Sequence, residues 1–159
     1  MDYLYRYYEK RGTGGFFTSN NLAFPCEQLK RLGGFDVSFP LAAGEDRELC
    51  QRWARAGLPL RFVAAARVYH EHALTPGSFV RQHFNYGRGA FQFHRLRSRQ
   101  SDGKIRVEPL SFYRDLLLYP LTQSPTLRGL GGSGLLLLSQ VSNVAGYFWE
   151  RARQKRSAE

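Results

Sequence analysis

Over residues 45–56, hydrophobic side chains recur at the spacing of one face of a helix. That face consists of Asp46, Leu49, Cys50 and Trp53. Gly57 follows directly, and glycine readily takes the left-handed backbone conformation that ends many helices. The pattern therefore predicts a helix over 45–56 with Trp53 in the core. It also places Asp46 on the buried face, which is an unusual position for a solvated surface acid.

Other segments have the composition of strands and short helices. Residues 16–24 and 60–70 are rich in strand-forming side chains, and Pro25 ends the first of them. Residues 27–32 predict a short helix that stops at a pair of glycines. A short amphipathic helix is also expected over 2–10. We therefore expect two strands and three helices before residue 71.

A long helix is predicted after the second strand. Thr75 suits the N-cap position and Pro76 the first helical position. The apolar pattern continues from 77 to 97, with interruptions expected near Gly87 and Gly89 because glycine weakens a helix interior.

Two apolar stretches, 112–121 and 129–149, follow a polar connection. The second has no charge over 21 residues, and about 20 residues span a bilayer. Its five glycines and three serines weaken its hydrophobicity. Basic residues lie on both sides of this stretch. A single span would place one of these basic flanks outside the cell, against the positive-inside tendency. A helix lying in the membrane interface, or a re-entrant one, keeps both basic flanks on the inside. A buried helix in a soluble protein is the alternative.

The charge of the chain favours an anionic partner. The 159 residues carry a net charge of +10 and are 43% hydrophobic, which suits a folded domain with a modest core. No acid occurs between Glu71 and Asp102, where several arginines do. Phosphate groups, an anionic bilayer or a nucleic acid would fit this charge. No nucleic-acid-binding motif is present, so nucleic acid is the weakest of the three. The two cysteines have no metal-ligand spacing.

Several polar residues are candidates for chemistry. Glu45 and Asp46 open the predicted helix, where the helix dipole and free N–H groups favour a fixed carboxylate; equally, acids in a first turn can simply stabilise a helix. His70 ends the second strand and could bind a metal or be a hydrogen-bonded core residue, as could His72. Asn20 and Asn21 lie within the first strand, where asparagine is unfavourable. Local turn bonding is the alternative to function for this pair.

Five pieces in order, Ser19-Asn-Asn-Leu-Ala-Phe, Gly33-Gly-Phe-Asp, Gly44-Glu-Asp, Val68-Tyr-His-Glu-His and Arg81-Gln-His-Phe-Asn-Tyr-Gly-Arg-Gly, resemble the C-terminal half of the catalytic domain of family 2 glycosyltransferases. The resemblance covers residues 16–100. It implies an α/β chain, the distal half of a GT-A (nucleotide-diphospho-sugar transferase) fold, followed here by apolar helices. It also implies inverting transfer from a nucleotide-sugar donor to an acceptor hydroxyl, as in the synthesis of envelope or surface polysaccharide or glycolipid.

The resemblance assigns roles to the candidate residues. Asp46 would be the general base and Glu45 would orient the acceptor. His70 would help to hold a divalent metal, Mg²⁺ or Mn²⁺. Asn20 and Asn21 would line the floor of the donor and acceptor site. Arg88 would contact either a diphosphate or an anionic membrane, two alternatives that the sequence leaves open.

The family pattern is incomplete in this sequence. The chain has no Asp-x-Asp, the family's main metal motif, and only fifteen residues precede Phe16. We therefore expect a nucleotide-binding half to lie upstream or on another subunit. The expected organisation is an acceptor-side unit over 1–101, a linker over 102–110, apolar interfacial helices over 111–150 and a basic tail over 151–159. Cytoplasmic nucleotide sugars would place the site on the cytoplasmic face of the membrane. A non-catalytic membrane-associated remnant or split subunit is the main alternative, and a basic nucleic-acid-binding protein the third.

Overall fold

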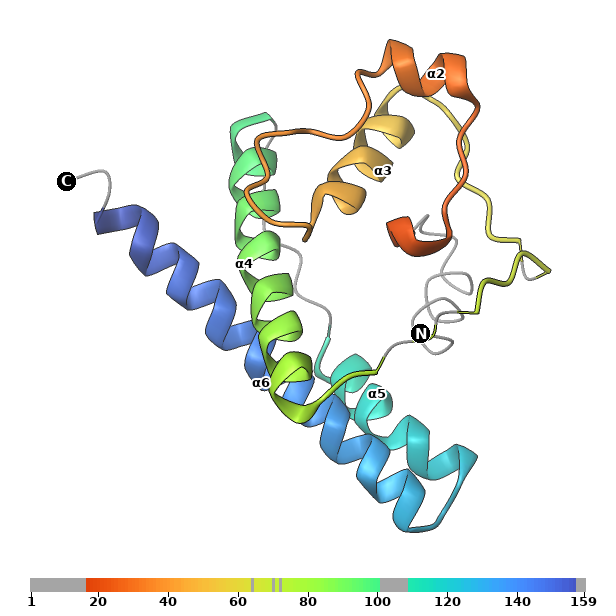
Figure 1. The fold of residues 1–159 in the computed structure, drawn as a ribbon, viewed down its shortest axis with the longest axis vertical. Coiled ribbons are helices and arrows are strands. Elements are labelled where there is room, and N and C mark those ends of the chain that lie inside the picture. Colours follow the sequence, from red (N-terminus) through yellow and green to blue (C-terminus); the bar gives the residue numbers. More distant parts are fainter. Residues whose placement is uncertain (1–16, 64, 70, 72, 101–108, 157–159) are drawn as a thin grey trace.

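The computed structural model describes residues 17–63, 65–69, 71, 73–100 and 109–156. Every regular element among them is helical (Figure 1). The elements are η1 (Ser19–Asn21), α2 (Cys26–Arg31), α3 (Glu45–Arg55), α4 (Pro76–Gln100), α5 (Leu110–Gln123) and α6 (Leu127–Arg156).

The expected α/β class is wrong for the described part of the chain, which contains no strand. The expected strands were 16–24 and 60–70, of which the structure describes 17–24, 60–63 and 65–69. The first turns through η1, with the Asn21 N–H donating to the Thr18 carbonyl at 3.2 Å. The second is almost wholly exposed, including Val68 and Tyr69. Strand propensity depends on burial against neighbouring strands. The second segment has neither a sheet to join nor a core to cover.

The helices near the N-terminus agree with the sequence pattern. α3 begins at Glu45 as expected, and Trp53 is 4% exposed, which confirms it as a core residue. Leu49 and Cys50 are buried beside it. Gly57 has a φ of 73° and ends the helix in the left-handed region, as predicted. α2 also ends where the glycine pair begins.

α4 is one uninterrupted helix, and the break expected near Gly87 and Gly89 is absent. Its start is as predicted: the Thr75 side-chain oxygen accepts a hydrogen bond from the Ser78 N–H at 3.2 Å. The two glycines are places where other backbone touches the helix. A Cβ on Gly87 would overlap the carbonyl of Asn143 in α6, and one on Gly89 would overlap the carbonyl of Ala43. These glycines serve close approach rather than a kink.

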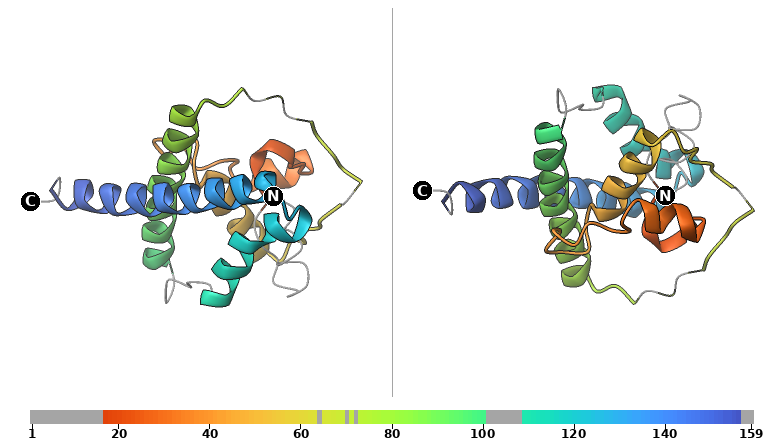
Figure 2. Two further views of the ribbon diagram at one scale, coloured as in Figure 1. Left: turned by 90° about the horizontal axis from the view of Figure 1, so that it is seen from below. Right: turned by 90° about the horizontal axis from the view of Figure 1, so that it is seen from above.

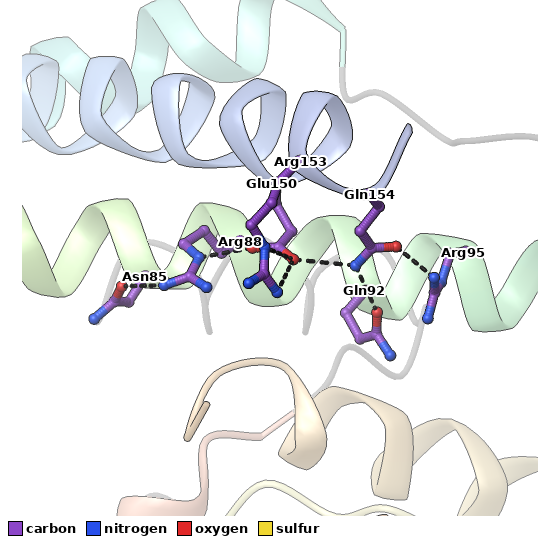
Figure 3. A network of polar contacts seen from close by, with 7 residues as sticks. All are labelled: Asn85, Arg88, Gln92, Arg95, Glu150, Arg153 and Gln154. Atoms are coloured by element: carbon purple, nitrogen blue, oxygen red, sulfur yellow. Dashed lines mark hydrogen bonds and ion pairs between the residues drawn. The ribbon is translucent and has the colours of Figure 1, made fainter. Parts of the chain in front are cut away.

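α6 is a single long rod that crosses α4, and all views show the two helices in contact (Figures 1 and 2). A Cβ on Gly146 would overlap the carbonyl of Phe84, so the helix backbones meet closely at this crossing. α5 packs on the earlier part of α6, where the Ser133 hydroxyl donates to the Leu117 carbonyl at 2.7 Å. α3 lies on the other side of α4 from α6 (Figure 3).

The buried face of α6 is made of small and polar residues rather than large apolar ones. The buried set is Gly129, Ser139, Ser142, Gly146 and Glu150. The expectation of apolar helices over 111–150 is therefore wrong, because α6 packs through a small and polar face. No helix in the described part of the chain combines the length and the apolar character needed to cross a membrane. The expected domain boundaries stay predictions, although α6 continues to Arg156 through the expected start of the basic tail.

Candidate functional site

The two adjacent carboxylates lie in the first turn of α3, as the sequence predicted. The Asp46 Oδ2 accepts a hydrogen bond from the Ser19 N–H at 3.2 Å, and its Oδ1 accepts one from the Arg47 N–H at 2.7 Å. Asp46 is partly buried. The carboxylate is therefore held by backbone donors on two segments while part of it still reaches solvent, which is the position that a general base needs.

The segment 17–21 lies along this face of α3. One turn beyond Asp46, the Cys50 thiol donates to the Phe17 carbonyl at 3.6 Å, and burial raises the pKa of that thiol. Asn21 donates through Nδ2 to the Ala66 carbonyl at 2.8 Å, and Asn20 accepts from the Thr18 hydroxyl. The segment that carries Asn20 and Asn21 thus meets Asp46 through Ser19. Asn20 takes part in the local turn bonding that was its alternative explanation, whereas the Asn21 side chain bonds to a residue 45 positions away.

Glu45 lies in a drier environment than its neighbour. Its Oε2 is buried and has no hydrogen-bond partner among the described residues. Burial, reinforced by the charge of Asp46, raises the pKa of Glu45 above its ordinary value. The environments of the two acids therefore differ, a condition under which adjacent carboxyl groups can take different roles.

The loop before α3 rests directly on α4. Gly44 has a φ of 93°, which suits glycine, and a Cβ there would lie 2.9 Å from the Gly89 carbonyl and 3.3 Å from the Phe39 ring. From the other side, Gly89 meets the carbonyl of Ala43. We call this backbone contact, formed by Ala43, Gly44 and Gly89, the glycine seat. It sets the distance between the carboxylate pair and α4.

Arg52 is a structural residue that the sequence analysis did not single out. Its guanidinium donates to the Glu48 carboxylate at 2.7 Å, to the Gly34 carbonyl at 2.7 Å and to the Leu32 carbonyl. The bonds hold the turn between α2 and the following loop against α3. The i, i+4 spacing of Glu48 and Arg52 was the available signal.

A buried polar network joins α4 to α6 (Figure 3). At its centre Glu150 is 3% exposed and contacts Arg88 at 2.8 Å and Arg153 at 3.1 Å. Gln154 donates to Glu150 at 3.1 Å, and Arg88 also lies over the Trp149 ring at 4.6 Å. Burial opposes ionisation of Glu150, but the hydrogen bonds from Arg88, Gln154 and Arg153 outweigh it, so its pKa is lowered.

The network gives Arg88 a protein partner in this structure, rather than leaving it open to a diphosphate or a bilayer. Its side chain is only 17% exposed. The sequence analysis missed Glu150, yet a signal existed: it is the only acid between Asp115 and Glu159, within a basic segment.

A shallow depression of about 310 Å³ opens beside the loop that leads to α3. Its lining is polar and carries one positive charge. The residues are Ala42, Ser78, Arg81, Gln82, Asn85 and Tyr86. Arg81 is exposed, and among the described residues no acid pairs with it. This depression, rather than Arg88, offers a cation to an anionic group beside Ala42.

The described residues do not form a metal centre: no three of their histidine, cysteine, aspartate and glutamate side chains come together to hold an ion. His70, the expected ligand, lies outside the described residues. The carboxylates of Glu45 and Asp46 alone do not make such a set.

Comparison with known proteins gives two matches. The family described as "Glycosyl transferase family group 2" matches residues 3–149. A stretch of 56 residues is 41% identical to the chondroitin synthase of Escherichia coli, and covers 35% of this chain and 8% of that protein. The chain therefore matches only a small part of this curated relative. No solved structure matches the chain.

Proposed function

This chain belongs to glycosyl transferase family group 2, and we propose that it takes part in moving a sugar from a nucleotide-sugar donor to an acceptor hydroxyl. The similarity of one stretch to a chondroitin synthase supports polysaccharide synthesis as the setting. The observation that carries the proposal is the Asp46 carboxylate, held by the Ser19 N–H at the start of α3 within the matched region.

In the proposed step Asp46 is the general base. It takes the proton from the acceptor hydroxyl as that oxygen forms a bond to the anomeric carbon. The bond from this carbon to the donor's phosphate oxygen breaks, and the electron pair leaves with the nucleoside diphosphate. Attack from the face opposite the leaving group inverts the anomeric configuration. The Ser19 and Arg47 N–H groups keep the carboxylate oriented, as base catalysis requires.

The neighbouring groups have separate roles in this proposal. Glu45 orients the acceptor, with its carboxyl proton retained to higher pH because burial raises its pKa. Arg81, in the depression beside the Ala42 loop, contacts the anionic donor as a charge-assisted donor. Family members generally use a divalent metal, but the described residues supply no set of ligands for one, and no step here passes through a metal. Because nucleotide sugars are cytoplasmic, the site works on the cytoplasmic side.

The test is nucleoside diphosphate release by the natural polypeptide that contains this sequence, measured with uridine, guanosine and thymidine diphosphate sugars. Asp46→Asn keeps the shape of the side chain and removes the base. We expect turnover to fall by about 10²–10⁴-fold, with donor affinity little changed. Glu45→Gln should lower turnover less and weaken acceptor binding more.

Glu27→Gln is the matched control, because Glu27 is an exposed acid in a first helical turn that forms an exposed pair with Lys30. It should leave turnover unchanged. Near-normal turnover in Asp46→Asn would show that the acid pair only stabilises the start of α3, and that the base lies elsewhere. Product analysis by NMR would establish whether the anomeric configuration inverts.

A further inference from the structure

The outward face of α6 carries a continuous apolar stripe. It consists of Leu130, Leu137, Val141, Val144 and Phe148. Their spacing of three, four or seven residues places them on one side of the helix, opposite the buried face of Ser139, Ser142 and Gly146. Each is between 53% and 60% exposed. The stripe is about 27 Å long at the rise of an α-helix, so α6 turns its larger apolar side chains outward and its small residues inward.

The same stripe ends in positive charge. Arg151 and Lys155 continue the spacing from Val144 and Phe148, and both are exposed. The only acid in α6 is Glu150, which is 3% exposed and engaged by Arg88 and Arg153. The solvent-facing side of α6 therefore presents apolar and cationic groups with no exposed negative charge.

We propose that this stripe docks on the surface of an anionic lipid bilayer. The apolar side chains would enter the boundary between headgroups and acyl chains, with α6 lying in the plane of the membrane. Arg151 and Lys155 would bind lipid phosphates, where each basic residue adds to the attraction. The net charge of +10 favours the same partner. The inference is independent of the proposed glycosyl transfer.

Charge argues against a second copy of this chain as the occupant. In a parallel pair of α6 helices, Arg151 and Lys155 would face their own counterparts across the seam. In an antiparallel pair they would face the apolar end of the stripe, near Leu130. Two chains of charge +10 also repel each other over longer distances. An anionic bilayer satisfies both the apolar and the basic part of the stripe at once.

The experiment is flotation of the full chain with vesicles of phosphatidylcholine alone or with about one third phosphatidylglycerol. We expect binding to the anionic vesicles, weakened at high salt because the charges lie near solvent. Leu137→Gln together with Val141→Gln should weaken binding by about tenfold or more, since two exposed apolar side chains no longer enter the bilayer. Circular dichroism should show unchanged helicity, because both residues face outward.

A pair of charge reversals separates the stripe from general charge. Arg151→Glu with Lys155→Glu should weaken binding to anionic vesicles by about tenfold or more. Arg31→Glu with Arg61→Glu changes the net charge equally at exposed positions outside α6, and should weaken it much less. Equal losses from the two pairs, or equal binding to neutral vesicles, would overturn the proposal. So would a lipid-free dimer, seen by light scattering, that the Leu137 and Val141 changes abolish.

Discussion

The α4–α6 crossing and the region of residues 17–75 are held together in different ways. At the crossing, two long helices meet at Gly87 and Gly146 and share the buried network around Glu150. The earlier region has short elements, and much of it is tied by single bonds from a side chain to a carbonyl, such as Asn21 to Ala66. Its buried apolar side chains lie in and just before α3, and the described residues of 17–42 and 57–75 add none to them.

This difference places the candidate base where the packed helix α3 meets the loosely packed segment 17–42, through the Ser19 N–H. Segments with few buried apolar contacts open at lower free energy than closely packed helices. Asp46 is nevertheless fixed relative to α4, because the loop before it rests on Gly89 through the glycine seat. The crossing therefore acts as the support for the loop and helix that carry the proposed base.

The largest loss of stability should come from Glu150→Ala, which removes the central acid of the α4–α6 crossing. Removing one partner of a buried ion pair leaves Arg88 without its main counter-charge, and such losses cost about 3–5 kcal/mol. Urea denaturation should show this decrease in unfolding free energy. Glu27→Ala, which breaks only an exposed pair with Lys30, should cost less than about 1 kcal/mol. Equal effects would mean that the network does not stabilise the crossing.

The same network makes the stability of the fold depend on pH. The pKa of Glu150 lies below the ordinary value of 4.5, so its stabilisation is complete above that value and is lost as the pH falls through the lowered pKa. Glu150→Gln should remove this part of the acid sensitivity, because glutamine does not titrate in that range.

A smaller effect is expected from filling the glycine contacts at the crossing. Gly87→Ala and Gly146→Ala each place a methyl group against a backbone carbonyl, and overpacking of this kind costs about 1–3 kcal/mol. Gly131→Ala and Gly134→Ala are the matched controls in α6, since a Cβ there meets nothing within 4 Å. They should raise stability by up to about 1 kcal/mol. Thermal unfolding of the four variants would reveal whether the helices truly meet at Gly87 and Gly146.

The smallest effect concerns the earlier region. Asn21→Asp keeps the size of the side chain but cannot donate to the Ala66 carbonyl. We expect a loss of about 0.5–1.5 kcal/mol, with faster hydrogen exchange near residues 60–69 and no change across α4 and α6. Faster exchange throughout the molecule would show that the two regions unfold as one unit, and the contrast between them would not hold.

Local patterns in the sequence predicted individual helices well. The apolar spacing and Gly57 located α3 to within one residue, and Thr75 and Pro76 located the start of α4. These signals act within a few residues of one another. They also placed Glu45 and Asp46 at a helix start, where the structure has them. Strand-like composition over 17–24 and 60–69 misled the analysis, because strand formation depends on neighbours that composition does not specify.

The features that a single sequence hid are those that join distant segments. Arg88 and Glu150 are 62 residues apart, and neither residue type indicates the other as its partner. Gly87 and Gly89 suggested a helix break, since local propensity counts their flexibility but not the backbone that approaches them. The inward-facing serines of α6 were likewise counted as weak apolar character, although they mark the side that packs.

The glycine seat also limits how the site can vary. Glycine is the smallest residue, so every substitution at Gly44 or Gly89 adds atoms between the loop and α4. Any such change can move the loop in one direction only, away from the helix and with Glu45 and Asp46 attached to it. No mutation at these two positions can bring the acid pair closer to α4. A shorter distance between the acid pair and α4 must therefore come from changes elsewhere in the loop, such as at Phe39, whose ring lies against Gly44.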